Sequence, residues 1–149
     1  MNLATFGDYA ARTRESFARQ PAMRAMGISI DDIAPGEVWL SMPFNPDFTQ
    51  QHGFMHAGAI VSGLDTAAGF AAFTLMPEEA GVLTVELKTS LMRPGKGQQF
   101  NFHARVLKPG RTILFTEAVA TAIDGEREHE IARLTATMMA VQGRDDVKG

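Results

Sequence analysis

Asp65 is the residue of this chain with the clearest chemical potential. It stands inside a long apolar stretch, residues 56–76, that contains no lysine or arginine. An aspartate is rarely buried without a partner or a role. Such a carboxylate could activate water as a general base, or attack an electrophilic carbon itself. A structural role, in which Asp65 caps a backbone group or is hydrogen-bonded across an interface, is the alternative.

The beginning of the same stretch could supply an electrophilic half of a site. If residues 56–76 form a helix, its first N–H groups, including those of Ala57 and Gly58, have no acceptor within the helix and lie at the positive end of its dipole. However, nine residues at about 100° each place His56 and Asp65 on opposite faces, about 13.5 Å apart along the axis. A site that uses both would need two copies of the helix, related by a two-fold axis.

The side of this helix that carries Asp65 would let another backbone approach closely, because most of its residues are small. They are Gly58, Val61, Ser62, Ala68, Gly69 and Ala72. This pattern is consistent with a homo-oligomer in which two such helices meet.

The composition excludes other kinds of chemistry and partner. The chain has 149 residues, with 14 Lys and Arg against 17 Asp and Glu and no long basic run, so we expect no nucleic-acid partner. It has no cysteine, which excludes disulfides and thiol nucleophiles. His52, His103 and His129 lack the spacing of metal ligands, so we expect no metal and no cofactor. No signal peptide is visible, and Asp65 argues against a membrane span, so we expect a cytoplasmic protein without a membrane partner.

Periodicity predicts the elements around the helix. An apolar stripe predicts an amphipathic helix over residues 4–19. Two strands, 27–33 and 37–42, precede an irregular segment at 43–55, and four strands with period-two alternation follow the central helix. In the first of these four, Val85, Leu87 and Leu91 are expected on one face and Thr84, Glu86 and Lys88 on the other.

This order predicts the α+β class. We expect a single domain, residues 1–149, in which a curved antiparallel sheet of about six strands wraps around the long central helix. One side of the helix would then remain for a partner.

Several segments carry a recognisable pattern. Residues 50–58 read Gln-Gln-His-Gly-Phe-Met-His-Ala-Gly and are followed by Asp65. Residues 83–87, 91–94 and 106–111 continue the pattern. In these segments, and over most of residues 25–141, the chain resembles the hotdog-fold acyl-CoA thioesterases, in particular the PaaI-like group and the related 4-hydroxybenzoyl-CoA thioesterases. Ala57 stands where the family has the first glycine of His-Gly-Gly, which narrows the space above it.

The resemblance implies a hotdog fold and hydrolysis of an acyl-CoA thioester by a homodimer, or by a dimer of dimers. It implies that Asp65 is base or nucleophile, that the Ala57 N–H of another subunit stabilises the oxyanion, and that Gln50 holds the attacking water or the carbonyl. Gln50 could equally order its loop. His56 could contact the acyl group, although a cap or packing role is more usual. Thr84 could assist the water or be an ordinary strand threonine.

Substrate contacts and alternative functions complete these expectations. Gly58 lies at the helix start, and Arg93, Lys96, Lys108 and Arg111 cluster at predicted turns, where they could meet the phosphates of coenzyme A or be merely solvated.

A hotdog hydratase or dehydratase would pair a histidine with the acidic residue, which this chain lacks in the needed place. A non-catalytic acyl-CoA-binding protein would gain nothing from a carboxylate beside a neutral carbonyl. The sequence does not define the acyl group.

Overall fold

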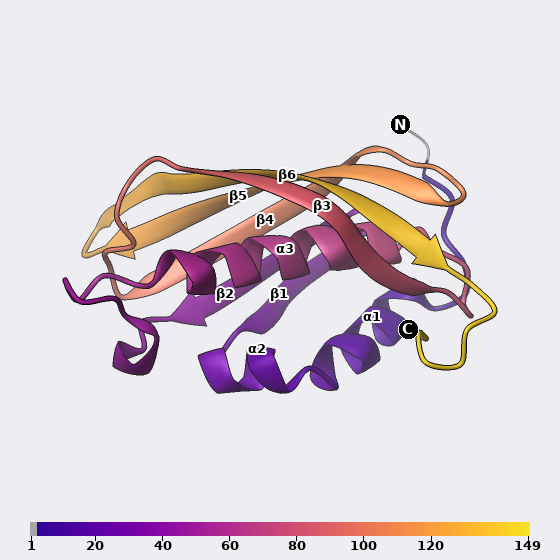
Figure 1. Cartoon of the computed structure of the whole chain (residues 1–149), viewed down its shortest axis with the longest axis horizontal. Coiled ribbons are helices and arrows are strands. Elements are labelled where there is room, and N and C mark those ends of the chain that lie inside the picture. Colours follow the sequence, from indigo (N-terminus) through magenta and orange to yellow (C-terminus); the bar gives the residue numbers. More distant parts are fainter. Residues whose placement is uncertain (1–2) are drawn as a thin grey trace.

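The chain folds as a curved sheet wrapped around one helix (Figure 1). The computed structural model describes residues 3–149, so the first two residues of the expected 1–149 domain lie outside it. The elements are α1 (Tyr9–Ala18), α2 (Pro21–Met26), β1 (Ser29–Ala34), β2 (Glu37–Pro43), a short 3-10 helix (Pro46–Phe48), α3 (Ala57–Phe73), β3 (Gly81–Leu91), β4 (Gln99–Lys108), β5 (Ile113–Asp124) and β6 (Arg127–Val141).

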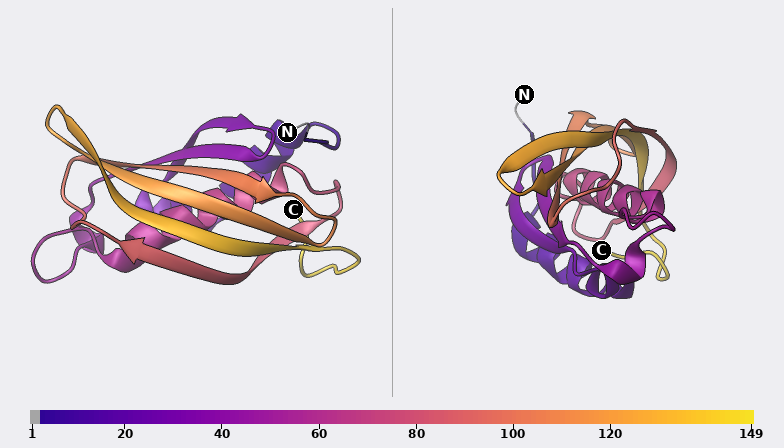
Figure 2. Two further views of the ribbon diagram at one scale, coloured as in Figure 1. Left: turned by 90° about the horizontal axis from the view of Figure 1, so that it is seen from above. Right: turned by 90° about the vertical axis from the view of Figure 1, so that its left-hand side faces the viewer.

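All six strands form one antiparallel sheet in the order β1-β2-β4-β5-β6-β3. The sheet curls around α3, while α1 and α2 lie on the open side (Figure 2). Inward-facing side chains such as Phe100, Phe102 and Leu134 alternate with outward-facing polar ones and are fully buried against the helix. The predicted α+β class and the six strands are confirmed.

The central helix is shorter than the sequence predicts. Its α-helical part ends at Phe73 rather than at residue 76, because the last turn tightens before Pro77: the N–H groups of Leu75 and Met76 bond to carbonyls three residues back. Thr74 joins this end to the β1–β2 turn by accepting a hydrogen bond from the N–H of Gly36 (2.8 Å). No helix in residues 3–149 is long and apolar enough to cross a membrane.

The first helix also differs from its predicted limits. It begins at Tyr9 rather than at residue 4, because the Asp8 carboxylate caps its first turn. Arg12 of α1 donates through Nη2 to the carbonyls of Phe73 and Met76, at 3.3 and 2.8 Å. A cation at the negative end of a helix is stabilising, so this contact fastens α1 to the end of α3.

An edge strand with a bulge gives the largest departure from the predicted pattern. β3 pairs only with β6 in residues 3–149 and lies at the edge of the sheet. The register shifts between Thr84 and Glu86, which bulges Val85 out of the ladder. Thr84 is opposite the buried Met138, on the face that covers α3, whereas Glu86 is opposite Thr137 and accepts its hydroxyl hydrogen bond on the outer face. The expectation that Thr84 and Glu86 share a face is therefore wrong.

Candidate active site

The start of α3 has one N–H group without an internal partner. The N–H of Gly58 donates to Nδ1 of His56 (2.8 Å), and those of Ala59 and Ile60 donate to the His56 carbonyl (2.9 and 3.2 Å). The N–H of Ala57 has no acceptor within residues 3–149. Because this group lies at the positive end of the helix, it is available to the oxygen of a bound molecule.

His56 is the N-cap of α3, which was the alternative to a direct chemical role. Since Nδ1 accepts the Gly58 N–H, the neutral ring carries its hydrogen on Nε2 and can only donate there. A base role for His56 would require breaking the cap. The same bond occupies the N–H of Gly58, so that residue contributes space rather than a donor.

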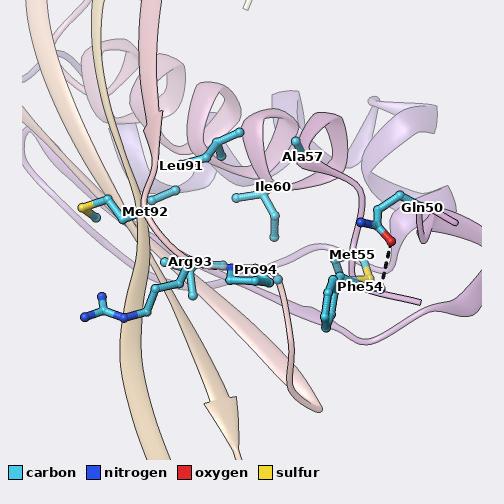
Figure 3. Close-up of a pocket in the computed structure, with 12 residues that line it drawn as sticks. Gln50, Phe54, Met55, Ala57, Ile60, Leu91, Met92, Arg93 and Pro94 are labelled. Atoms are coloured by element: carbon cyan, nitrogen blue, oxygen red, sulfur yellow. Dashed lines mark hydrogen bonds between the residues drawn. The ribbon is translucent and has the colours of Figure 1, made fainter. Parts of the chain in front are cut away.

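The side chain of Gln50 orders the loop before α3 with its oxygen and leaves its NH2 group for another partner. Its Oε1 accepts the N–H groups of His52 (2.6 Å) and Phe54 (3.3 Å). The side-chain NH2 group then points away from those bonds, and Gln50 and Ala57 border the same pocket (Figure 3). The loop-ordering role is therefore present, and what remains for a ligand is donation from Nε2.

This pocket, which we call the Ala57 pocket, has a volume of about 400 Å³ and lies between the start of α3 and the end of β3. Met55, Ile60 and Leu91 give it apolar walls. Arg93 lies at its edge, but its guanidinium points away from Ala57 and donates to the Glu130 carbonyl at 2.7 Å (Figure 3).

The charge of Arg93 has an acidic neighbour. The pKa of Glu130 lies below its usual value because Arg133 hydrogen-bonds to its carboxylate, and the charges of Arg133 and Arg93 act in the same direction. The Glu130 carboxylate therefore stays ionised and offsets part of the positive charge of Arg93 and Arg133.

The structure brings Asp65 and Thr84 together from two elements far apart in the sequence. The Thr84 hydroxyl donates to Oδ1 of Asp65 at 2.8 Å, while Oδ2 has no hydrogen-bond partner within residues 3–149. Both residues border a second cavity of about 230 Å³ between α3 and β3, which we call the Asp65 cavity. A half-exposed carboxylate with one oxygen held and the other free can accept a proton or attack an electrophile.

Within one protomer these two groups of residues stay apart. Ala57 and Asp65 are eight residues apart on α3, or about 12 Å along its axis. The Ala57 pocket and the Asp65 cavity share no lining residue. One chain thus carries two incomplete sets of groups, a donor set at the helix start and a carboxylate set at its middle.

The expected coenzyme A contacts at the β4–β5 turn lie elsewhere. Arg111 borders a hollow with Leu75 and Met76, beyond the C-terminal end of α3, and Lys108 ends the adjacent strand. The structure does not bring Lys108 or Arg111 to the Ala57 pocket of the same protomer. His103, one of the histidines without metal-ligand spacing, is hydrogen-bonded to Glu37 (3.0 Å) and stacked on Trp39 on the outer face of the sheet.

Comparisons with known proteins agree with this architecture. The family model described as "Thioesterase superfamily" matches residues 52–129. A solved thioesterase family protein from Silicibacter pomeroyi is 51% identical, with a TM-score of 0.90 over 91% of this chain and 99% of that one. The structure of the E. coli PaaI protein from the phenylacetic acid degradation operon is similar in fold, with a TM-score of 0.82 at 16% identity over 91% and 94% of the two chains. The medium/long-chain acyl-CoA thioesterase YigI of E. coli K12 is 27% identical over 135 residues, 80% of this chain and 84% of YigI.

Proposed function

This chain belongs to the thioesterase superfamily and has its hotdog fold, and from this premise we propose that it hydrolyses acyl-CoA thioesters to coenzyme A and a carboxylic acid. One observation carries the proposal: α3 bears an unpartnered N–H at its start, among residues 3–149, and a carboxylate held by Thr84 at its middle. Ester hydrolysis needs both a donor for the oxyanion and a base or nucleophile. The similarity to an enzyme named as an acyl-CoA thioesterase supports the thioester as substrate.

The proposed reaction uses one set of groups from each of two subunits. The thioester carbonyl accepts hydrogen bonds from the Ala57 N–H and from Nε2 of Gln50, which stabilise the oxyanion as it forms. One such donor is worth about 2.7 to 4 kcal/mol. Oδ2 of Asp65 from the other subunit takes a proton from water as the water oxygen bonds to the carbonyl carbon. The carbon–sulfur bond then breaks, and the proton passes from Asp65 to the departing thiolate.

Direct attack by Asp65 is the second route to the same products. Its carboxylate would form an anhydride with the acyl group and release coenzyme A, and water would then cleave the anhydride. The bond from Thr84 supports either route, because it fixes the orientation of the carboxylate through Oδ1 and leaves Oδ2 without a partner in the part of the chain that the structure describes.

The exposed edge of β3 supports a dimer as the active form. The strand carries Leu83, Val85 and Leu91 at 46, 56 and 52% exposure, a long apolar edge that is a liability in an isolated protomer. Pairing of two β3 edges about a two-fold axis would cover these side chains and align the two α3 helices. Such a dimer could join the Ala57 pocket of one subunit to the Asp65 cavity of its partner.

Thiol release from a panel of acyl-CoA esters tests this function. We expect saturable release of free coenzyme A from at least one ester. The Asp65→Asn variant should lose this activity while it keeps the oligomeric mass and the fold of the wild type. If every ester binds to the wild type but none is cleaved, the chain is a binding protein and the proposal fails.

A further inference from the structure

The three glycines of α3 that follow Ala57 differ in whether their surroundings would leave room for a side chain. A Cβ added at Gly63 would lie 2.3 Å from the Phe102 ring, and one added at Gly58 would lie 3.0 Å from the His56 ring. Packing within the protomer therefore accounts for both. At Gly69 an added Cβ would meet no atom of residues 3–149 within 4 Å, although the residue is buried in a regular helix.

A glycine inside a helix is destabilising relative to alanine, so an open position of this kind needs a reason. Gly69 lies on the wall of the Asp65 cavity, one turn of helix beyond Asp65 itself. The missing side chain enlarges this cavity next to the carboxylate. The space is thus kept open where a reacting group would enter.

From these observations we propose that the Asp65 cavity holds the acyl group of the substrate, and that Gly69 and Gln20 limit the size of the acyl group accepted. The inference rests on the proposed function. It assigns the acyl chain to the subunit that supplies Asp65, and the arm of coenzyme A to the Ala57 pocket of the other.

The chemistry of the two hollows favours this assignment. Within residues 3–149 the Asp65 cavity is lined by the apolar side chains of Phe70, Val82 and Leu83 beside the polar ones of Gln20, Asp65, Thr66 and Thr84, and by no lysine or arginine. Phosphates would find no cation there and would face the charge of Asp65. The larger Ala57 pocket has Arg93 at its edge.

The size of the cavity indicates which acyl groups fit inside it. A cavity of about 150 Å³ takes up benzene, so the 230 Å³ beside Asp65 has room for one aromatic ring with a small substituent, or for a short aliphatic chain. A long fatty acyl chain would extend beyond this space.

The corner between α1 and α2 borders one end of the cavity. Gln20, which lies between these helices, lines it together with Phe70. The Phe70 ring is held from behind by Phe17 of α1, with the ring centroids 5.7 Å apart in an edge-to-face arrangement. The N-terminal helices therefore supply the end wall, and they are fastened to α3 by Arg12.

Filling the cavity is the first test. The series wild type, Gly69→Ala, Gly69→Leu is assayed with acetyl-, butanoyl-, hexanoyl-, benzoyl- and dodecanoyl-CoA. We expect the ratio of kcat/KM for hexanoyl over acetyl ester to fall about tenfold in Gly69→Ala and further in Gly69→Leu, since one methylene in an apolar pocket changes rates by roughly 10-fold to 200-fold. Gly69→Ala should unfold at no lower temperature than the wild type. An unchanged ratio of kcat/KM for hexanoyl over acetyl ester overturns the inference. A variant whose measured mass is that of a monomer also overturns it, because the space at Gly69 would then belong to the partner subunit.

Shortening the end wall is the complementary test. In Gln20→Ala we expect the ratio of kcat/KM for longer over shorter esters to rise about tenfold. Gln99→Ala, on the outer face of β4, is the matched control and should keep the wild-type ratio. If Gln20→Ala keeps the wild-type profile, the α1–α2 corner does not limit the acyl group.

The two proposals fail in different ways. If the wild type releases no thiol from any ester, the proposed function is wrong. If it cleaves esters but prefers dodecanoyl-CoA to the short and aromatic esters, only the acyl assignment is wrong.

Discussion

The two halves of α3 show two ways in which a fold presents reactive groups. At its start the groups are those of the backbone. The N–H of Ala57 has no acceptor among residues 3–149, because the His56 side chain accepts the Gly58 N–H and the His56 carbonyl accepts those of Ala59 and Ile60. At its middle the groups are side chains, and Asp65 acquires its partner only because β3 passes beside the helix.

This difference teaches which changes each half tolerates. A backbone donor survives most substitutions, so the alanine that replaces the family's glycine at position 57 keeps it. A side-chain pair depends on both residues and on the register of the strand, and here a bulge at Val85 turns Thr84 toward α3. Substitutions that remove one group at a time therefore separate the two halves.

Ala57→Pro should have the largest effect, because it deletes the proposed oxyanion donor alone. Proline is well tolerated at the first position of a helix, and His56 already has the extended backbone, φ −59° and ψ 138°, that a residue before proline needs. We expect kcat to fall roughly 10²- to 10³-fold with an unchanged circular dichroism spectrum. Ala57→Gly, which keeps the N–H, should retain activity. Normal turnover in Ala57→Pro would remove the helix start from the mechanism.

Asp65→Asn should come next, with kcat lower by at least about 10², because the amide keeps the shape but loses the basicity. A single turnover of excess wild-type enzyme in ¹⁸O-labelled water then separates the two roles of Asp65. A general base puts the label into the acid product at once. A nucleophile whose anhydride is opened by water at the Asp65 carboxyl carbon leaves its own unlabelled oxygen in the acid product and takes the label into Asp65, which mass analysis of the protein detects. Near-normal turnover of Asp65→Asn would contradict both roles.

The helices and strands could be predicted from the sequence because they follow from local signals. The geometry of the candidate active site could be predicted only in part. Alternation along residues 99–106 marks a strand wherever it lies in the sheet, and Pro77 ends a helix by its own chemistry. The partners of β3 depend on contacts across the whole chain, so neither its edge position nor the bulge that separates Thr84 from Glu86 can be read from a period of two. The acceptor bonds of Gln50 are set by loop geometry, and only its amide type is visible in the sequence.

Mixing the two inactive variants tests whether the halves come from different chains. In a heterodimer of Asp65→Asn with Ala57→Pro, one shared site collects both defects and the other collects none. Random re-pairing makes about half of the dimers mixed, so activity should return to about a quarter of wild type, roughly 25-fold above a parent that keeps 1%. Absence of recovery after subunit exchange, verified by mass, would mean that each site lies within one chain.

Thr84→Val should lower kcat about tenfold, because the carboxylate loses the bond that orients it while the strand keeps a side chain of similar shape. Thr84→Ser should restore most of the activity. Thr137→Val is the matched control, since this threonine lies on the outer face and bonds to Glu86. Equal losses in Thr84→Val and Thr137→Val would assign the effect to sheet stability rather than to Asp65.

The smallest effects concern the charges that could meet coenzyme A. Arg93 borders the Ala57 pocket, whereas Lys108 and Arg111 lie beyond the other end of α3. Exposed ion pairs contribute about 0.2 to 1 kcal/mol each. If Lys108 and Arg111 reach the phosphates from the partner subunit, replacing both by Gln should therefore raise KM roughly twofold to thirtyfold at unchanged kcat, as expected for contacts shared by ground and transition states. Added salt should also raise the KM of the wild-type enzyme, and it should raise the KM of the double variant less. An unchanged KM in the double variant, with a raised KM in Arg93→Gln, would assign the phosphates to the helix start and leave the β4–β5 turn as a solvated surface.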